Sequence, residues 1–194
     1  MAKVALFCAV ILSAAYAPSS QAALIVSGVS LSDNNAGDFI SGFSSAQSGY
    51  TWTLNLPNFQ QSNFSFPAGE LGLGVTLTES EPRQNLTSLV ITWYGVFQSA
   101  GFGEPSVHFE QLANGNSHTG TFSTSPAGDI ISFAPAQSVD FTTLLTLSDN
   151  GGIAGVSRIR IDAAGVPEPG TISMLALGLA LLGACAVVKK ESRQ

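Results

Sequence analysis

A histidine and a glutamate two positions apart have the clearest chemical potential in the chain. His108 and Glu110 lie in Val107–Leu112, which reads as a β-strand, and the period of two places both side chains on one face. His118 follows the turn Asn114-Gly115-Asn116, so a hairpin could gather three side chains of a type that zinc accepts. A solvated strand face explains the same residues more simply, and we therefore expect no metal and no cofactor.

Two turn segments gather oxygen-bearing side chains around glycine, as calcium loops do. They are Asp33-Asn34-Asn35-Ala36-Gly37-Asp38 and Asp149-Asn150-Gly151-Gly152. The first lacks the spaced terminal glutamate of an EF-hand, and the second has fewer ligand-type residues. A turn with solvated Asx side chains accounts for both segments, and a weak calcium site stays open as the alternative.

Four aromatic residues sit in two apolar stretches and have two plausible roles. Tyr50, Trp52, Trp93 and Tyr94 could stack on sugar rings at a binding face. The same alternation with small polar residues suits core packing, which is the commoner fate of large aromatic side chains. Trp52 and Trp93 are therefore the candidate residues for carbohydrate stacking, with the core as the preferred interpretation.

The elements that carry these residues are predicted to be short β-strands. Strict alternation marks four of them, and a nearly continuous apolar stretch, Leu89–Tyr94, predicts a central strand covered on both faces. The four alternating stretches are Tyr50–Leu56, Leu73–Thr78, Phe141–Leu147 and Arg158–Asp162. Weaker candidates are Leu24–Leu31, Phe39–Phe43, Ser62–Phe66, Val107–Leu112, Thr119–Ser123 and Ile130–Phe133.

Eight to ten such strands, separated by Gly- and Asn-rich turns, predict an all-β fold. We expect an antiparallel β-sandwich of jelly-roll type spanning residues 23–165 as one domain. This span contains no cysteine and no lysine, and its 11 acidic residues and three arginines give it a net charge of −8. Such an acidic surface repels phosphate backbones, which argues against nucleic-acid binding.

The first 22 residues have the features of a secretory signal peptide. Lys3 supplies a positive start, and an apolar stretch from Val4 to Tyr16 follows. Its 13 residues are fewer than the roughly 20 that span a bilayer. Small residues at Ser20 and Ala22 predict that signal peptidase cuts after Ala22.

The last 29 residues combine a proline motif, an apolar stretch and a basic end. Val166-Pro167-Glu168-Pro169-Gly170-Thr171 precedes an uncharged stretch, 172–188, that is long enough for a short membrane helix. Lys189, Lys190 and Arg193 in the final segment, 189–194, should stay on the cytoplasmic side, which places the preceding domain outside the cytoplasm.

This arrangement resembles the PEP-CTERM sorting signal, with Pro167, Glu168 and Pro169 in the motif and Lys189, Lys190 and Arg193 in the basic end. The resemblance covers roughly residues 166–193 and implies processing by an exosortase, a membrane-embedded cysteine transpeptidase. It also implies a Gram-negative bacterium that makes exopolysaccharide. The inner membrane would hold the protein transiently before it reaches the cell surface or the medium.

Three hypotheses for function follow. The first is a non-enzymatic surface or extracellular matrix protein associated with exopolysaccharide in a biofilm. The second is a carbohydrate-binding module. The third is a secreted hydrolase that uses His108 and Glu110, although the sequence contains no nucleophile elbow, phosphate loop or dinucleotide fingerprint.

Overall fold

The fold is built from strands in which apolar and polar residues alternate. The computed structural model describes residues 23–35, 37–62, 67–81, 84–167 and 179. Within these ranges it contains eleven strands. They are β1 (Leu24–Asp33), β2 (Ser44–Ser48), β3 (Thr51–Asn55), β4 (Gln60–Ser62), β5 (Glu70–Glu79), β6 (Gln84–Gln98), β7 (Ser106–Ala113), β8 (Asn116–Phe122), β9 (Ala127–Ala136), β10 (Ser138–Ser148) and β11 (Ile153–Pro167).

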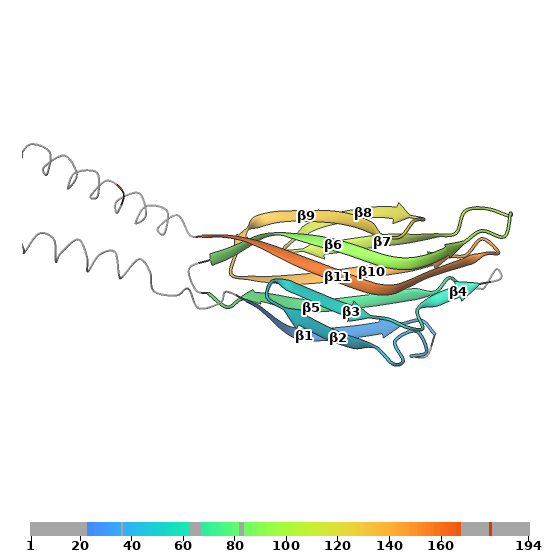
Figure 1. Ribbon diagram of the computed structural model, residues 1–194, viewed down its shortest axis with the longest axis horizontal. Helices are drawn as coiled ribbons and strands as arrows, with labels where there is room; N and C mark the ends of the chain where they lie inside the picture. Colours follow the sequence, from blue (N-terminus) through green and yellow to red (C-terminus); the bar gives the residue numbers. More distant parts are fainter. Residues whose placement is uncertain (1–22, 36, 63–66, 82–83, 168–178, 180–194) are drawn as a thin grey trace, which may run out of the picture. The chain divides into compact units, whose positions relative to one another are not determined.

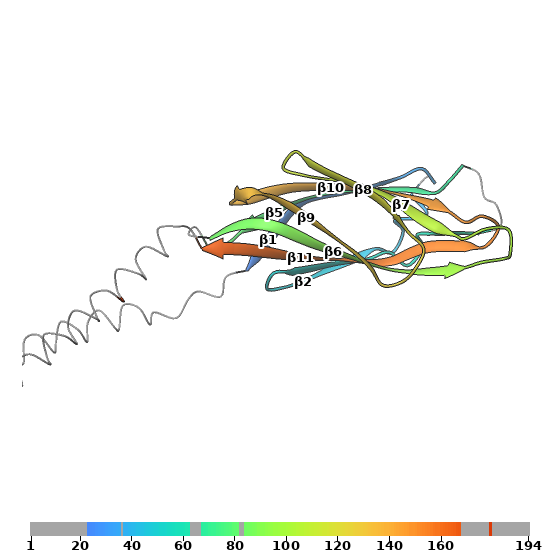
Figure 2. The ribbon, with the colours of Figure 1, turned by 90° about the horizontal axis from the view of Figure 1, so that it is seen from above.

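The strands form two antiparallel sheets that face each other (Figures 1 and 2). One has the order β1-β5-β10-β7-β8, and the other has the order β2-β3-β11-β6-β9, with β4 paired to β11. Four strand pairs enclose one another along the chain and alternate between the two sheets. From the innermost outward they are β7/β8, β6/β9, β5/β10 and β3/β11. This is the wrapping of a jelly roll, so the predicted all-β sandwich is confirmed.

The core lies between the sheets and is filled by every second residue of the long strands. On β5 these are Leu71, Leu73, Val75 and Leu77, all buried. The inward residues of the opposite sheet include Trp52, Leu54, Leu86, Leu89, Ile91, Trp93, Ile131, Phe133, Ala154, Val156, Ile159 and Ile161. A compact unit therefore runs from Ala23 to Val166, and its inward faces follow the period of two that the sequence shows.

The structure corrects two strand predictions and adds one strand that was missed. Val90, Thr92 and Tyr94 of β6 are only half-buried, so this strand is covered on one face rather than on both. The segment 39–43 forms turns instead of a strand, because the carboxylate of Asp33 accepts hydrogen bonds from the backbone N–H groups of Phe39 and Ile40. Strand β2 was not predicted, since its sequence is polar and exposed throughout.

The predicted signal peptide (1–22) and membrane helix (172–188) lie outside the described residues, except for Leu179. Glu168, Pro169 and the basic residues Lys189, Lys190 and Arg193 also lie outside them. Within the described part of the chain, no helix has the length and apolar character needed to span a bilayer.

Candidate functional site

The two histidines lie on opposite faces of the β7/β8 hairpin. His108 and Glu110 point outward from β7, with Nε2 of the histidine 3.6 Å from Oε1 of the glutamate. His118 is paired in register with the buried Gln111, so it faces the other way, and its Nδ1 lies 2.6 Å from Oδ2 of Asp129 on β9. The hairpin therefore does not assemble the zinc set, and the described residues contain no group of three His, Cys, Asp or Glu side chains placed to hold a metal.

The first calcium-like segment is organised by hydrogen bonds from its own backbone. Oδ1 of Asp33 accepts N–H groups from Asn35 at 3.3 Å and Gly37 at 2.7 Å. Oδ2 accepts N–H groups from Phe39 at 2.9 Å and Ile40 at 3.3 Å. Both carboxylate oxygens are thus engaged with the loop, which is the turn chemistry expected of an Asx residue.

The second calcium-like segment is also a hydrogen-bonded turn. Gly151 donates its N–H to Oδ1 of Asp149 at 3.0 Å, and Gly152 donates to the carbonyl of Asp149 at 2.7 Å. Asn150 has a positive φ of 45° and donates its side-chain amide to the carbonyl of Glu104. Its role in the structure is therefore to fix the β10–β11 turn against the β6–β7 loop.

Trp52 and Trp93 belong to the core, so the sugar-stacking role suggested for them is wrong. Trp52 is 2% exposed and Trp93 is 1% exposed. The Trp93 ring lies 5.0 Å from the ring of Phe122, nearly parallel to it, and 4.7 Å from the ring of Phe109. Neither indole has a face open to a sugar, because packing between the two sheets covers both.

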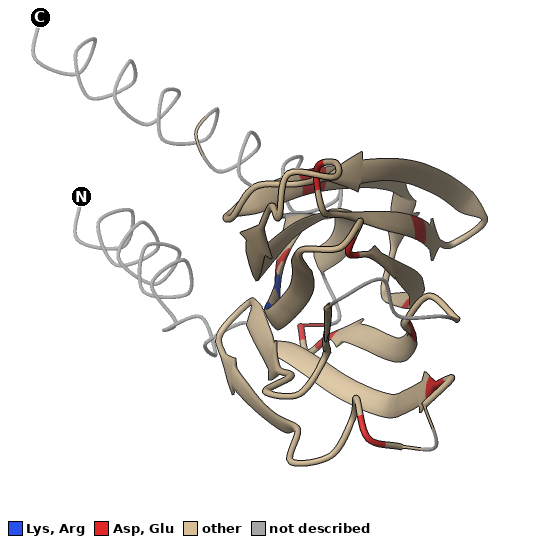
Figure 3. Ribbon diagram, turned by 90° about the vertical axis from the view of Figure 1, so that its right-hand side faces the viewer, with Lys and Arg blue, Asp and Glu red and all other residues tan. Residues whose placement is uncertain are grey.

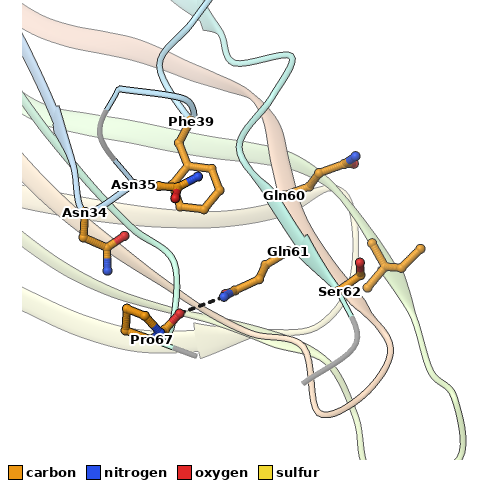
Figure 4. A pocket seen from close by; sticks show the side chains of 8 residues that line it. Asn34, Asn35, Phe39, Gln60, Gln61, Ser62 and Pro67 are labelled. Atoms are coloured by element: carbon orange, nitrogen blue, oxygen red, sulfur yellow. Dashed lines mark hydrogen bonds between the residues drawn. The ribbon is translucent and has the colours of Figure 1, made fainter. Parts of the chain in front are cut away.

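A pocket of about 400 Å³ opens at the end of the sandwich that carries the β1–β2 loop and β4 (Figure 4). Chain entry and exit lie at the opposite end, where Leu24 pairs with Glu79 in register and Gly165 lies close to the Glu79 carboxylate. The lining residues are Asn34, Asn35, Phe39, Gln60, Gln61, Ser62, Pro67 and Ile153. Four of these residues carry carboxamides, and no described residue of the lining carries a charge.

Two of the four carboxamides hold the wall of the pocket in place. Asn34 donates to the carbonyl of Ala68 at 2.7 Å and accepts the N–H of Glu70 at 2.9 Å. Gln61 donates to the carbonyl of Pro67 at 2.8 Å and accepts the N–H of Gly69 at 2.7 Å. Each amide thus replaces a missing backbone partner, and together they fix the segment from Pro67 to Glu70.

The ring of Phe39, one of the residues that line the pocket, is closely packed. Phe39 is 8% exposed and meets Phe59 edge to face, with ring centroids 5.4 Å apart. A Cβ at Gly69 would come within 3.0 Å of the Phe39 ring and 3.1 Å of Oε1 of Gln61. A side chain at this position would therefore displace the ring or the amide.

The other two carboxamides, those of Asn35 and Gln60, are available. Both residues are exposed and line the pocket, and neither side chain makes a hydrogen bond to another described residue. An amide offers two donor hydrogens and one acceptor oxygen. The pocket therefore combines a fixed wall with two free groups that can both donate and accept.

Two shallower hollows lie on the outer faces of the sheets. One, of about 570 Å³, crosses the five-stranded sheet above Gly72 and Gly74 and is bordered by Glu110 and the exposed Leu112 and Leu144. The other, of about 440 Å³, adjoins Arg158. Both are more open than the pocket at the end of the sandwich.

Positive charge is confined to one strand among the described residues (Figure 3). Arg158 stacks over the ring of Tyr94, with 4.3 Å between the guanidinium carbon and the ring centroid. Arg160 is paired with Asp162, at 2.8 Å between Nε and Oδ2, and hydrogen bonding to this carboxylate raises the pKa of Arg160. The outer face of β11 therefore carries one neutralised and one π-stacked guanidinium.

The end of the sandwich near chain entry and exit contains a buried carboxylate. Glu79 is 2% exposed and accepts the N–H of Glu81 at 3.1 Å. Burial, followed by the nearby Glu79 carboxylate, raises the pKa of Tyr50, whose hydroxyl donates to Oε1 of Gln84 at 3.0 Å. These groups lie beside Gly165, where the last strand approaches its end.

Comparison with known proteins gives three findings, the last of which concerns the C-terminal segment. No curated protein matches the sequence significantly. Solved structures share a limited likeness with the chain, and the following three are examples. A carbohydrate-binding module, TmCBM61, in complex with beta-1,4-galactotriose is 14% identical over 75% of this chain and 88% of its own, with a TM-score of 0.33. A family 29 carbohydrate-binding module is 16% identical over 76% of this chain and 90% of its own, with a TM-score of 0.26. The enzymatically active domain of bacteriophage CBA120 tailspike protein 4 is 12% identical over 76% of this chain and 19% of its own, with a TM-score of 0.26.

The family comparison concerns the C-terminal segment. A family model described as the PEP-CTERM protein-sorting motif matches residues 165–190. Strand β11 ends at Pro167, so the first three matched residues belong to the strand. The sequence-based resemblance is confirmed: residues 165–190 of this chain carry the PEP-CTERM protein-sorting motif.

Proposed function

We propose that this chain is an exported protein of the bacterial surface or extracellular matrix. Signal peptidase removes residues 1–22, the apolar segment 172–188 holds the protein briefly in the inner membrane, and an exosortase then removes the tail. The observation that carries this proposal is the sorting motif at residues 165–190, which continues directly from the last strand of the sandwich. The folded domain is therefore the cargo that the motif delivers.

We propose further that the delivered domain acts by binding to exopolysaccharide rather than by catalysis. His108 and Glu110, the best catalytic pair in the sequence, lie on the exposed outer face of β7 and do not line the pocket at the end of the sandwich. Turnover of a glycan or an ester that is abolished by Glu110→Ala would overturn this part of the proposal.

The sorting step is tested by a matched pair of substitutions in the producing bacterium. Glu168→Ala changes the centre of the motif, whereas Glu104→Ala changes a second Glu-Pro pair in the exposed loop between β6 and β7. We expect the Glu168 variant to keep its tail and to stay in the inner-membrane fraction. The Glu104 variant should be processed like the unmodified protein.

Mass spectrometry of the protein recovered outside the cell provides the decisive readout. Peptides from 172–194 should be absent there and should reappear, in the membrane fraction, when the exosortase is deleted. Full-length protein in the medium, or a cleavage pattern unchanged by the deletion, would refute the proposal.

A further inference from the structure

The pocket bounded by the β1–β2 loop and β4 is held open by hydrogen bonds before any ligand enters. The Asp33 carboxylate fixes the loop that carries Asn35 and Phe39, through the N–H groups of Asn35, Gly37, Phe39 and Ile40. Asn34 and Gln61 fix the opposite wall through the backbone of residues 67–70. A binding site prepared in this way loses little conformational freedom when it is filled.

The chemistry of the lining selects a class of ligand. The described residues that line the pocket include no charged side chain to compensate for the desolvation of an ion, which is costly. Its volume of about 400 Å³ lies within the range of small-molecule sites. Phe39, Pro67 and Ile153 supply apolar surface, while the amides supply paired donors and acceptors.

A neutral sugar matches both kinds of surface. Each hydroxyl both donates and accepts a hydrogen bond, as a carboxamide does, and the C–H faces of the ring are apolar. The side chains of Asn35 and Gln60 have no hydrogen bond to any other described residue, so each can bind a hydroxyl without breaking a contact to the described part of the chain.

We propose that this pocket binds a neutral saccharide, as the free end or a branch of a glycan chain, and that Asn35 and Gln60 supply its ligand-binding hydrogen bonds. The proposal deepens the proposed function by naming the ligand class of the exported domain, and its biological setting rests on that function. The binding itself does not depend on sorting, because full-length protein in detergent carries the same pocket.

The experiment compares two double variants of the full-length protein by calorimetric titration. Asn35→Ala with Gln60→Ala removes the two free amides of the pocket. Asn116→Ala with Gln98→Ala removes one exposed asparagine and one exposed glutamine from elsewhere on the domain. The probes are maltotriose, cellotriose and mannotriose, the exopolysaccharide of the producing bacterium, and trigalacturonate as the charged counterpart.

We expect at least one neutral trisaccharide to bind and the charged one to bind more weakly. The pocket variant should lose about tenfold or more in affinity, equivalent to about 1.4 kcal/mol, and the control variant should match the unmodified protein. Melting temperatures of both variants show whether the fold is retained.

A direct readout covers the case in which the pocket variant unfolds. In the unmodified protein, the side-chain amide resonances of Asn35 and Gln60 should shift on addition of the sugar, while that of Asn116 should not. No binding of any neutral probe at millimolar concentration would overturn the proposal. So would affinity unchanged in a folded pocket variant, or equal affinity for trigalacturonate. Successful sorting without sugar binding would refute this inference alone, and sugar binding without tail removal would refute the sorting proposal alone.

Discussion

Replacing Trp93 should destabilise the whole domain rather than weaken a surface contact. The side chain is 1% exposed and packs against the rings of Phe109 and Phe122, which lie on the opposite sheet with their centroids 6.3 Å apart. Truncation of a buried tryptophan to alanine costs about 3–5 kcal/mol. The two aromatic contacts, each worth about 0.5–1.5 kcal/mol, are part of this range, so we expect Trp93→Ala to fall in its upper half and to destabilise the domain by about 4–5 kcal/mol.

This loss is a large fraction of the roughly 5–15 kcal/mol that stabilises a typical domain. At about 2–4 °C per kcal/mol for a chain of this size, the melting temperature should fall by about 10–20 °C. Trp93→Phe should cost much less. It keeps an aromatic ring and removes the indole Nε1, which is buried and has no hydrogen-bond partner among the described residues.

The assay is urea denaturation of the purified protein and its two Trp93 variants, followed by circular dichroism. If Trp93 is a core residue, the free energy of unfolding should be highest for the unmodified protein, somewhat lower for Trp93→Phe and much lower for Trp93→Ala. If Trp93→Ala is destabilised by less than about 1 kcal/mol and instead loses sugar binding, the assignment of this indole to the core is refuted.

Two further outcomes follow from polar groups at opposite ends of the sandwich. Asp33→Ala leaves the N–H groups of Gly37 and Phe39 without their acceptor, so it should lower the free energy of unfolding by about 1–3 kcal/mol; an unchanged urea midpoint would contradict this. The raised pKa of Tyr50 means that the folded state holds the phenolic proton more tightly than the unfolded state does. The resulting stability is complete below the ordinary tyrosine pKa of about 10 and is lost as the pH rises above it. Urea denaturation should therefore give a lower free energy of unfolding at pH 11 than at pH 8, and Tyr50→Phe should make this difference smaller. An equal difference in both proteins would contradict the reasoning.

The fold could be predicted largely because one physical pattern repeats along the chain. Residues such as Leu73, Val75 and Leu77 alternate with small or hydroxylated residues, and each alternation places a row of apolar side chains on one face. The missed strand β2 has no such pattern, since it pairs at the edge of its sheet with every residue exposed. Edge pairing depends on a neighbouring strand rather than on the segment's own composition.

The pocket could not be predicted because four distant segments supply it. Asn34 and Asn35 follow β1, Gln60 and Gln61 lie on β4, Pro67 belongs to the next loop, and Ile153 begins β11. The sequence drew attention to the first segment as a turn organised by Asx side chains, with calcium binding as the alternative, but it gave no sign that the segment borders a cavity. Carboxamides in turns ordinarily face water, and only the pairing of β4 with β11 brings Gln60 beside a cavity.

One strand joins the pocket to the sorting motif, and this has a mechanical consequence. Strand β11 begins at Ile153 in the pocket wall and reaches Gly165, the first residue of the motif match. Its 15 residues span about 50 Å at roughly 3.3 Å per residue. A pull between a glycan held at one end and an attachment point at the other would run along this strand. It would load the hydrogen bonds to β3 and β6 in parallel, as shear, instead of opening them one after another. Such loading resists force better than peeling does.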